Sequence, residues 1–149
     1  MAKVATLLDD DHQAELLERR GMWDNTPLLV ACHYGHEPLA LMLLERGASA
    51  SAVNEVGCTA LLFACNEAME PLCVRLLADP SVDVNPPACM VYSKHTDETN
   101  SRTPLQAAAE SGFTAGVKLL LGRGAIAEPV ALGLAAARGH ADACTALLP

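Results

Sequence analysis

Residues 32–36 read Cys-His-Tyr-Gly-His, which brings one thiol and two imidazoles close together in the chain. Thiolates and imidazoles are the ligands that zinc prefers, so this segment is the strongest candidate for metal chemistry. Cys32, however, recurs as Cys65 in a matching segment 33 residues later, at an alanine-rich inner position. We therefore interpret Cys32 as a packing residue and predict that the chain binds no metal.

The sequence contains none of the common catalytic patterns. GxSxG, the P-loop, HExxH and GxGxxG are all missing. A triad assembled from scattered Ser, His and Asp residues stays open as an alternative, but no pattern favours one. We predict a protein that is not an enzyme and that holds no cofactor.

The composition favours packed helices and disfavours nucleic-acid binding. Hydrophobic residues make up 51% of the 149 residues and aromatic residues only 3%, with Ala and Leu dominant. Ala and Leu are strong helix formers, whereas strands are enriched in β-branched and aromatic residues. The net charge of −8 repels a phosphate backbone. We expect an all-α protein that binds no nucleic acid.

The positions of the cysteines and the lengths of the apolar runs indicate the cellular compartment of the protein. No apolar run reaches the roughly 18 residues of a transmembrane helix, and Leu7 and Leu8 run directly into Asp9–Asp11 where a signal peptide would stay apolar. Four of the six cysteines lie among helical apolar residues and no CxxC pair occurs. We predict reduced cysteines and an intracellular protein, cytoplasmic rather than nuclear, with no membrane insertion.

An internal repeat organises most of the chain. Residues 26–44 and 59–77, offset by 33, share ten identities in 19 positions. A third copy begins with TPLQAA at residue 103, and a weaker fourth copy runs from Val130 to Leu148. The offsets of 33, 44 and 27 differ because the connections between copies differ in length, which surface loops tolerate well.

Each copy is predicted to form two helices. A threonine can cap the first helix, and the proline that follows Thr26 and Thr103 suits a first helical turn. A glycine such as Gly35 then ends the first helix, and the second helix carries Leu39, Leu43 and Leu44 on one side. One such unit cannot bury its own apolar stripe, so neighbouring units must stack.

These features resemble the ankyrin repeat family, whose 33-residue unit carries the signature T-P-L-H-x-A. The resemblance covers roughly residues 22–149; the signature reads TPLLVA from Thr26 and TPLQAA from Thr103, with Leu29, Leu62 and Gln106 replacing its histidine. It implies an all-α ankyrin-repeat solenoid of stacked helix–turn–helix units with hairpin loops. It also implies that His36 and His140, in the Gly-His position, bridge adjacent loops.

The resemblance predicts a single ankyrin-repeat domain over residues 1–149. Its parts are a degenerate N-terminal cap at 3–24, repeat 1 at 25–57, repeat 2 at 58–101 with an inserted loop at 86–101, repeat 3 at 102–129 with a shortened hairpin, and repeat 4 at 130–149. Repeat 4 is either a short capping unit or a truncated one, in which case the chain is a fragment of a longer protein.

In this family, partners bind the concave face, which is formed by hairpin tips and the exposed side of each first helix. Carrying that surface over position by position gives the candidate contacts, together with two residues of the insertion: Trp23, Asn25, His33, Tyr34, Glu55, Val56, Asn66, Glu67, Met90, Tyr92, Glu110, Ser111 and Arg138. The first-helix positions among them vary between copies, while the flanking Ala and Leu positions repeat. Packing explains the repeated positions only.

Two features have open interpretations. Trp23 is either a contact residue, since tryptophan is enriched at interface hot spots, or a cover for the apolar end beside the N-terminal cap. The insertion 86–101 shows no helical period and is either part of the binding surface or a tolerated surface loop. The apolar run Met90–Tyr92 keeps the binding interpretation open.

The leading hypothesis is a protein–protein interaction module, an adaptor or scaffold that is monomeric alone and binds another protein through its concave face. The alternative is that the stack is the recognition part of a larger enzyme or channel. A third hypothesis, a metal- or redox-responsive protein that uses its cysteines, depends on chemistry that no sequence pattern supports.

Overall fold

The computed structural model describes residues 10–92 and 99–149. Helix α2 (Asp10–Leu17) and a short 3₁₀ turn η1 (Met22–Asp24) precede a series of helix pairs. The pairs are α3 (Pro27–His33) with α4 (Glu37–Glu45), α5 (Ala60–Asn66) with α6 (Glu70–Leu77), α7 (Pro104–Glu110) with α8 (Thr114–Gly122), and α9 (Pro129–Ala137) with α10 (Ala141–Leu147). Strands β1 (Cys89–Tyr92) and β2 (Thr99–Arg102) lie between α6 and α7.

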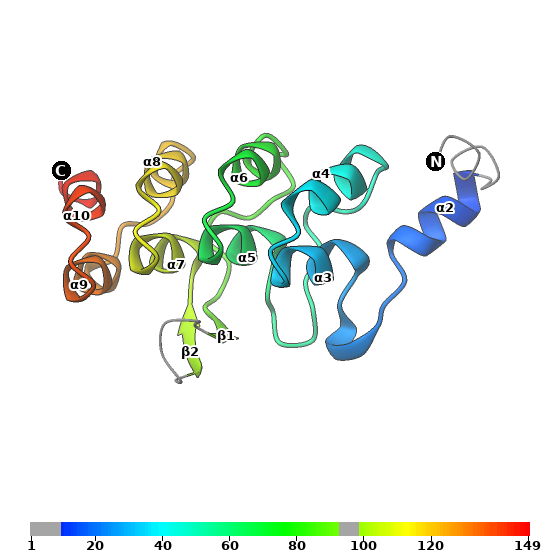
Figure 1. Ribbon diagram of the computed structural model, residues 1–149, viewed down its shortest axis with the longest axis horizontal. Coiled ribbons are helices and arrows are strands. Elements are labelled where there is room, and N and C mark those ends of the chain that lie inside the picture. The colour runs from blue at the N-terminus through cyan, green and yellow to red at the C-terminus, as the bar shows by residue number, and fades with distance from the viewer. Residues whose placement is uncertain (1–9, 93–98) are drawn as a thin grey trace.

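The helix pairs stack side by side in two layers (Figure 1). The first helices α3, α5, α7 and α9 form one layer, in which each packs on the next, and the second helices form the other layer. The connection between α4 and α5 and the β1–β2 hairpin between α6 and α7 project from the first-helix layer, away from the second helices. The predicted all-α repeat solenoid is confirmed.

Threonine caps begin three of the first helices. The side chains of Thr26, Thr59 and Thr103 each accept a hydrogen bond from the backbone N–H three residues later. Gln106 completes the third cap, because its Oε1 accepts from the Thr103 N–H at 3.2 Å. Its Nε2 also donates to Glu128 Oε2 at 3.0 Å, which ties the third pair to the fourth.

The first helices end in a left-handed residue that allows the chain to reverse. Gly112 has φ 71°, and a Cβ there would meet atoms of the His140 ring at less than 3 Å. His140 Nε2 lies 3.1 Å from the carbonyl oxygen of Glu110, so this histidine does bridge adjacent units. In the second unit a non-glycine residue, Ala68, adopts the same conformation with φ 54°.

The core runs through both layers as one continuous cluster. Leu72 and Leu76 of α6 are fully buried, as are Leu28 and Leu61 of the first helices. The predicted stripe on α4 is only partly correct. Leu44 is buried and Leu43 is partly buried against the core, but Leu39 is 42% exposed.

The insertion forms an antiparallel hairpin rather than an irregular loop. Strands β1 and β2 pair in the register Cys89 with Arg102 through Tyr92 with Thr99. The strands bring Cys89 beside Cys58, with their Cα atoms 5.4 Å apart, and the two are joined in a disulfide. The prediction of six reduced cysteines is therefore wrong for this pair, and the intracellular location that rested partly on it stays a prediction.

The remaining four cysteines are free, and three of them, Cys32, Cys65 and Cys73, are buried. Burial raises the pKa of Cys32 to about 12, with a smaller contribution from Cys73. Cys65 Sγ lies 4.0 Å from Cys73 Sγ, and this contact together with burial raises its pKa as well. Thiols that stay protonated are poor nucleophiles and poor metal ligands, so Cys32 and Cys65 are packing residues.

The N-terminal segment attaches to the first unit by polar contacts. Glu18 accepts from the Ser49 N–H at 2.7 Å, and Gln13 donates to the Arg46 carbonyl at 3.2 Å. Residues 3–9 of the predicted cap lie outside the described residues. The proposed repeat boundaries remain predictions. Within the described ranges, no helix combines the length and apolar character needed to span a bilayer.

Candidate partner-binding surface

Asn54 organises the first hairpin connection, residues 53–59. Its Oδ1 accepts from the N–H groups of Val56 and Cys58, at 3.2 and 2.8 Å, and its Nδ2 donates to Asn25 Oδ1 at 3.1 Å. These bonds fix the turn and leave Glu55 and Val56 exposed at its tip. Asparagine commonly bonds to backbone groups a few residues ahead in turns, which is the signal in the sequence that our prediction missed.

The turn η1 lies next to this connection. Trp23 and Asp24 both have positive φ, 62° and 57°, an unusual conformation for residues other than glycine. Neighbouring bonds hold it: the Trp23 carbonyl accepts from the Glu55 N–H at 3.2 Å, and Arg20 donates to the carbonyls of Val53 and Asp24. The turn and the first connection therefore form one supported unit.

Exposed apolar side chains gather at the tips of these connections. We call them the hairpin ridge, and all are between 46 and 80% exposed: Met22, Trp23, Val53, Val56 and Met90. In Figure 1 the turn η1, the connection between α4 and α5 and the β1–β2 hairpin, which carry these residues, extend on the same side of the first-helix layer. The exposure of Trp23 does not fit a ring that covers the apolar end of the stack. Clustered exposed apolar groups are typical of interaction sites.

An aromatic group lies at the end of α3. His33 packs edge-on against Tyr34, the residue that follows α3, with ring centroids 4.9 Å apart, and against Phe63 of α5 at 5.2 Å. Phe63 is buried, whereas His33 and Tyr34 are exposed. The contact between the units fixes the His33 ring and leaves the tyrosine available. Our sequence reasoning did not identify Phe63, because its position in the repeat is Val30 in the first copy.

The predicted contacts farther along the stack are less exposed. Asn66 and Glu67 are half-buried, and Asn66 Nδ2 donates to Glu67 Oε1 at 3.2 Å. Ser111 Oγ lies 3.2 Å from both the Cys65 and Ala108 carbonyls, so it ties the third unit to the second. Tyr92 ends strand β1. Ser111 thus joins two units through a hydrogen bond and is only partly exposed.

Glu110 is the clearest correction to the predicted surface. It was expected to be exposed, but its side chain is only 8% exposed and lies between two arginines. Arg102 of β2 contacts one carboxylate oxygen at 2.8 Å, and Arg138 of the fourth unit contacts the other at 2.9 Å. The carboxylate therefore joins the insertion, the third unit and the fourth unit.

Burial on its own would raise the pKa of Glu110. Hydrogen bonds from Arg102 and Arg138 and their positive charges outweigh that effect, so the pKa lies below its ordinary value. A lowered folded pKa means that this carboxylate stabilises the fold above its unfolded pKa. The contribution is lost as pH falls through the folded pKa.

We predict that Glu110→Gln lowers the free energy of unfolding at pH 7 by about 1.5–3 kcal/mol, the range for hydrogen bonds to charged groups. Urea unfolding at a series of pH values checks it. The difference between wild type and variant should shrink below about pH 4, where glutamate protonates. A difference that stays constant at acidic pH would show that the ion pairs do not stabilise the protein.

The described part of the chain contains no group of three or more His, Cys, Asp or Glu side chains that could hold a metal ion.

The stacked helix pairs and projecting connections define a helical repeat protein. The family model for ankyrin repeats, in three copies, matches residues 3–88. The chain belongs to the ankyrin repeat family. A search of curated proteins finds no match to it. Ankyrin repeats are generally protein–protein interaction modules.

Proposed function

We propose that this protein is an adaptor or scaffold that binds a partner protein across the hairpin ridge and the exposed ends of the first helices. The observation that supports this most is the ridge itself, where Met22, Trp23 and Val56 stay exposed on turns that hydrogen bonds hold in place. A rigid display of exposed apolar groups loses little conformational entropy on binding. Tyr34 and His33 extend the surface toward the first-helix layer.

Charge supports a protein partner rather than a nucleic acid. The chain carries eighteen acidic and ten Lys or Arg side chains. Two of those arginines, Arg102 and Arg138, are paired with Glu110. A surface of this balance repels phosphate groups and attracts basic protein surfaces.

A comparative pull-down tests the proposal. Val53→Ser/Val56→Ser removes apolar groups from the hairpin ridge, and Val74→Ser is the matched control, because Val74 is exposed to the same extent on α6 of the second-helix layer. Proteins captured by the wild type and by the control should be lost from the double variant. Capture that survives in the double variant and disappears in the control would place the site on the second-helix layer.

A further inference from the structure

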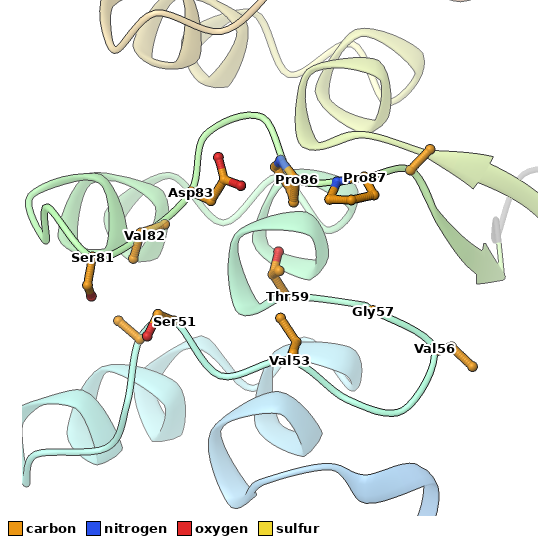
Figure 2. Close-up of a pocket in the computed structure, with 12 residues that line it drawn as sticks. Ser51, Val53, Val56, Gly57, Thr59, Ser81, Val82, Asp83, Pro86 and Pro87 are labelled. Carbon is orange, nitrogen blue, oxygen red and sulfur yellow. The ribbon is translucent and has the colours of Figure 1, made fainter.

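A cleft of about 330 Å³ separates the first hairpin connection from the one that follows it. One wall comes from residues 50–59 and the other from residues 81–88. Figure 2 shows Val53 and Thr59 from the first wall facing Val82 and Pro86 of the second. The volume lies at the lower end of the roughly 300–1,000 Å³ that is typical of ligand pockets.

The sequence explains why this gap stays open. Pro86 and Pro87 have no N–H, so the second connection cannot donate to the first from these positions. Each connection is instead tied on its far side. Glu55 N–H donates to the Trp23 carbonyl, and Asn85 bonds to the third connection through Gly124 and Ile126. The insertion therefore interrupts the regular contact between neighbouring hairpins.

A covalent bond fixes the two walls at one end. Cys58 lies between Gly57 and Thr59 of the first wall, and Cys89 directly follows Ala88 of the second. Their disulfide holds the walls at a set separation. A pocket that is held open in the free protein binds without the entropic cost of ordering its walls.

The chemistry of the walls is apolar with one negative charge. Val53, Val56 and Val82 supply apolar surface, and Asp83 is the only charged residue among those that line the cleft. Asp83 is exposed, and its Oδ1 accepts from the Asn85 N–H at 2.9 Å. Glu55 adds a second exposed carboxylate beside Val56.

Among the described residues, no Lys or Arg forms an ion pair with Asp83. Arg20 donates to the Val53 carbonyl at 2.6 Å, and its guanidinium already lies 3.7 Å from the carboxylate of Asp24. The cleft therefore presents an apolar interior beside an uncompensated carboxylate. A ligand that matches it combines an aliphatic group with an adjacent cation.

We propose that the cleft binds an extended segment of the partner protein, in which a large aliphatic side chain enters the cleft and a neighbouring Lys or Arg faces Asp83. This inference rests on the proposed function and names the chemistry of the partner. The hairpin ridge then supplies contact area with the partner. The cleft supplies selectivity for segments in which an aliphatic residue adjoins a Lys or Arg.

The test uses a displayed library of random peptides, selected on the wild-type protein under non-reducing conditions. Enriched peptides should place Leu, Ile or Met beside Lys or Arg. Ala88→Trp fills the cleft. It should lower the affinity for a synthetic copy of a selected peptide by about tenfold or more, equivalent to about 1.4 kcal/mol. Ala127→Trp is the matched control, on an exposed alanine outside the cleft, and should bind normally.

A second variant does not depend on a bulky substitution. Asp83→Asn keeps an oxygen that can accept from Asn85, and should weaken binding severalfold and reduce its dependence on salt. Three results would each overturn the proposal for the cleft. They are enriched peptides that lack a cation, peptides that bind Ala88→Trp as tightly as wild type, and no enrichment of any peptide. If a partner protein still bound in those cases, and Tyr34→Ala weakened its binding, the proposed function would hold without the cleft.

Discussion

Leu76→Ala is expected to lower the free energy of unfolding by roughly 2–5 kcal/mol, the range for truncating a buried leucine. Leu76 is fully buried on α6, which packs against both α4 and α8. The cavity would therefore lie in the middle of the stack. Repeat units are stabilised mainly by their neighbours, so the loss should reach the whole chain. Domains of this size have only about 5–15 kcal/mol of stability in total.

Urea unfolding followed by circular dichroism measures this effect. Val74→Ala is the control, because Val74 lies two residues away on the same helix but is half exposed. Its effect should stay within about 0.5 kcal/mol, as is usual for surface positions. Equal midpoints for the two variants would mean that α6 does not pack between its neighbours as described.

Trp23→Ala and Tyr34→Ala should each lower the affinity for a purified partner protein about thirtyfold. Aromatic anchors at interfaces often contribute 2 kcal/mol or more to the binding free energy. Both side chains are more than half exposed, so neither change removes core packing. Glu45→Lys serves as control: Glu45 is exposed at the end of α4, in the second-helix layer. Titration calorimetry gives the affinities, and circular dichroism should show an unchanged fold.

The β1–β2 hairpin provides the competing model. Replacing residues 90–101 with a short Gly-Ser turn removes most of the hairpin but keeps Cys89 and its bond to Cys58. If the partner binds the hairpin ridge and the first helices, this replacement should weaken binding only modestly, through the loss of Met90. Abolished binding, combined with normal affinity in both aromatic variants, would move the site to the insertion.

The repeat could be predicted from the sequence because its signals are local. The cap residues Thr26 and Thr103, and Gly112 at the end of a first helix, act within a few residues of their own positions. The 33-residue offset then requires that successive units stack. The buried leucines follow from the same periodicity. A sequence pattern of this kind determines the fold without knowledge of any long-range contact.

The errors concern contacts between residues distant in sequence. Glu110 varies among the copies and therefore suggested a recognition residue, but Arg102 and Arg138 approach it from other units and bury it. Cys58 and Cys89 lie 31 residues apart, and only the folded insertion brings them together. The periodicity of the chain carries no information about either arrangement.

The most direct test of the proposed binding face is photo-cross-linking from one position on each layer. A photoreactive phenylalanine analogue replaces Tyr34 at the end of α3 in one sample and Glu45 at the end of α4 in another. Both positions are exposed, so both tolerate the label. We predict that the partner cross-links to position 34 and not to position 45. A cross-link at position 45 alone would contradict binding through the hairpin ridge and the first helices.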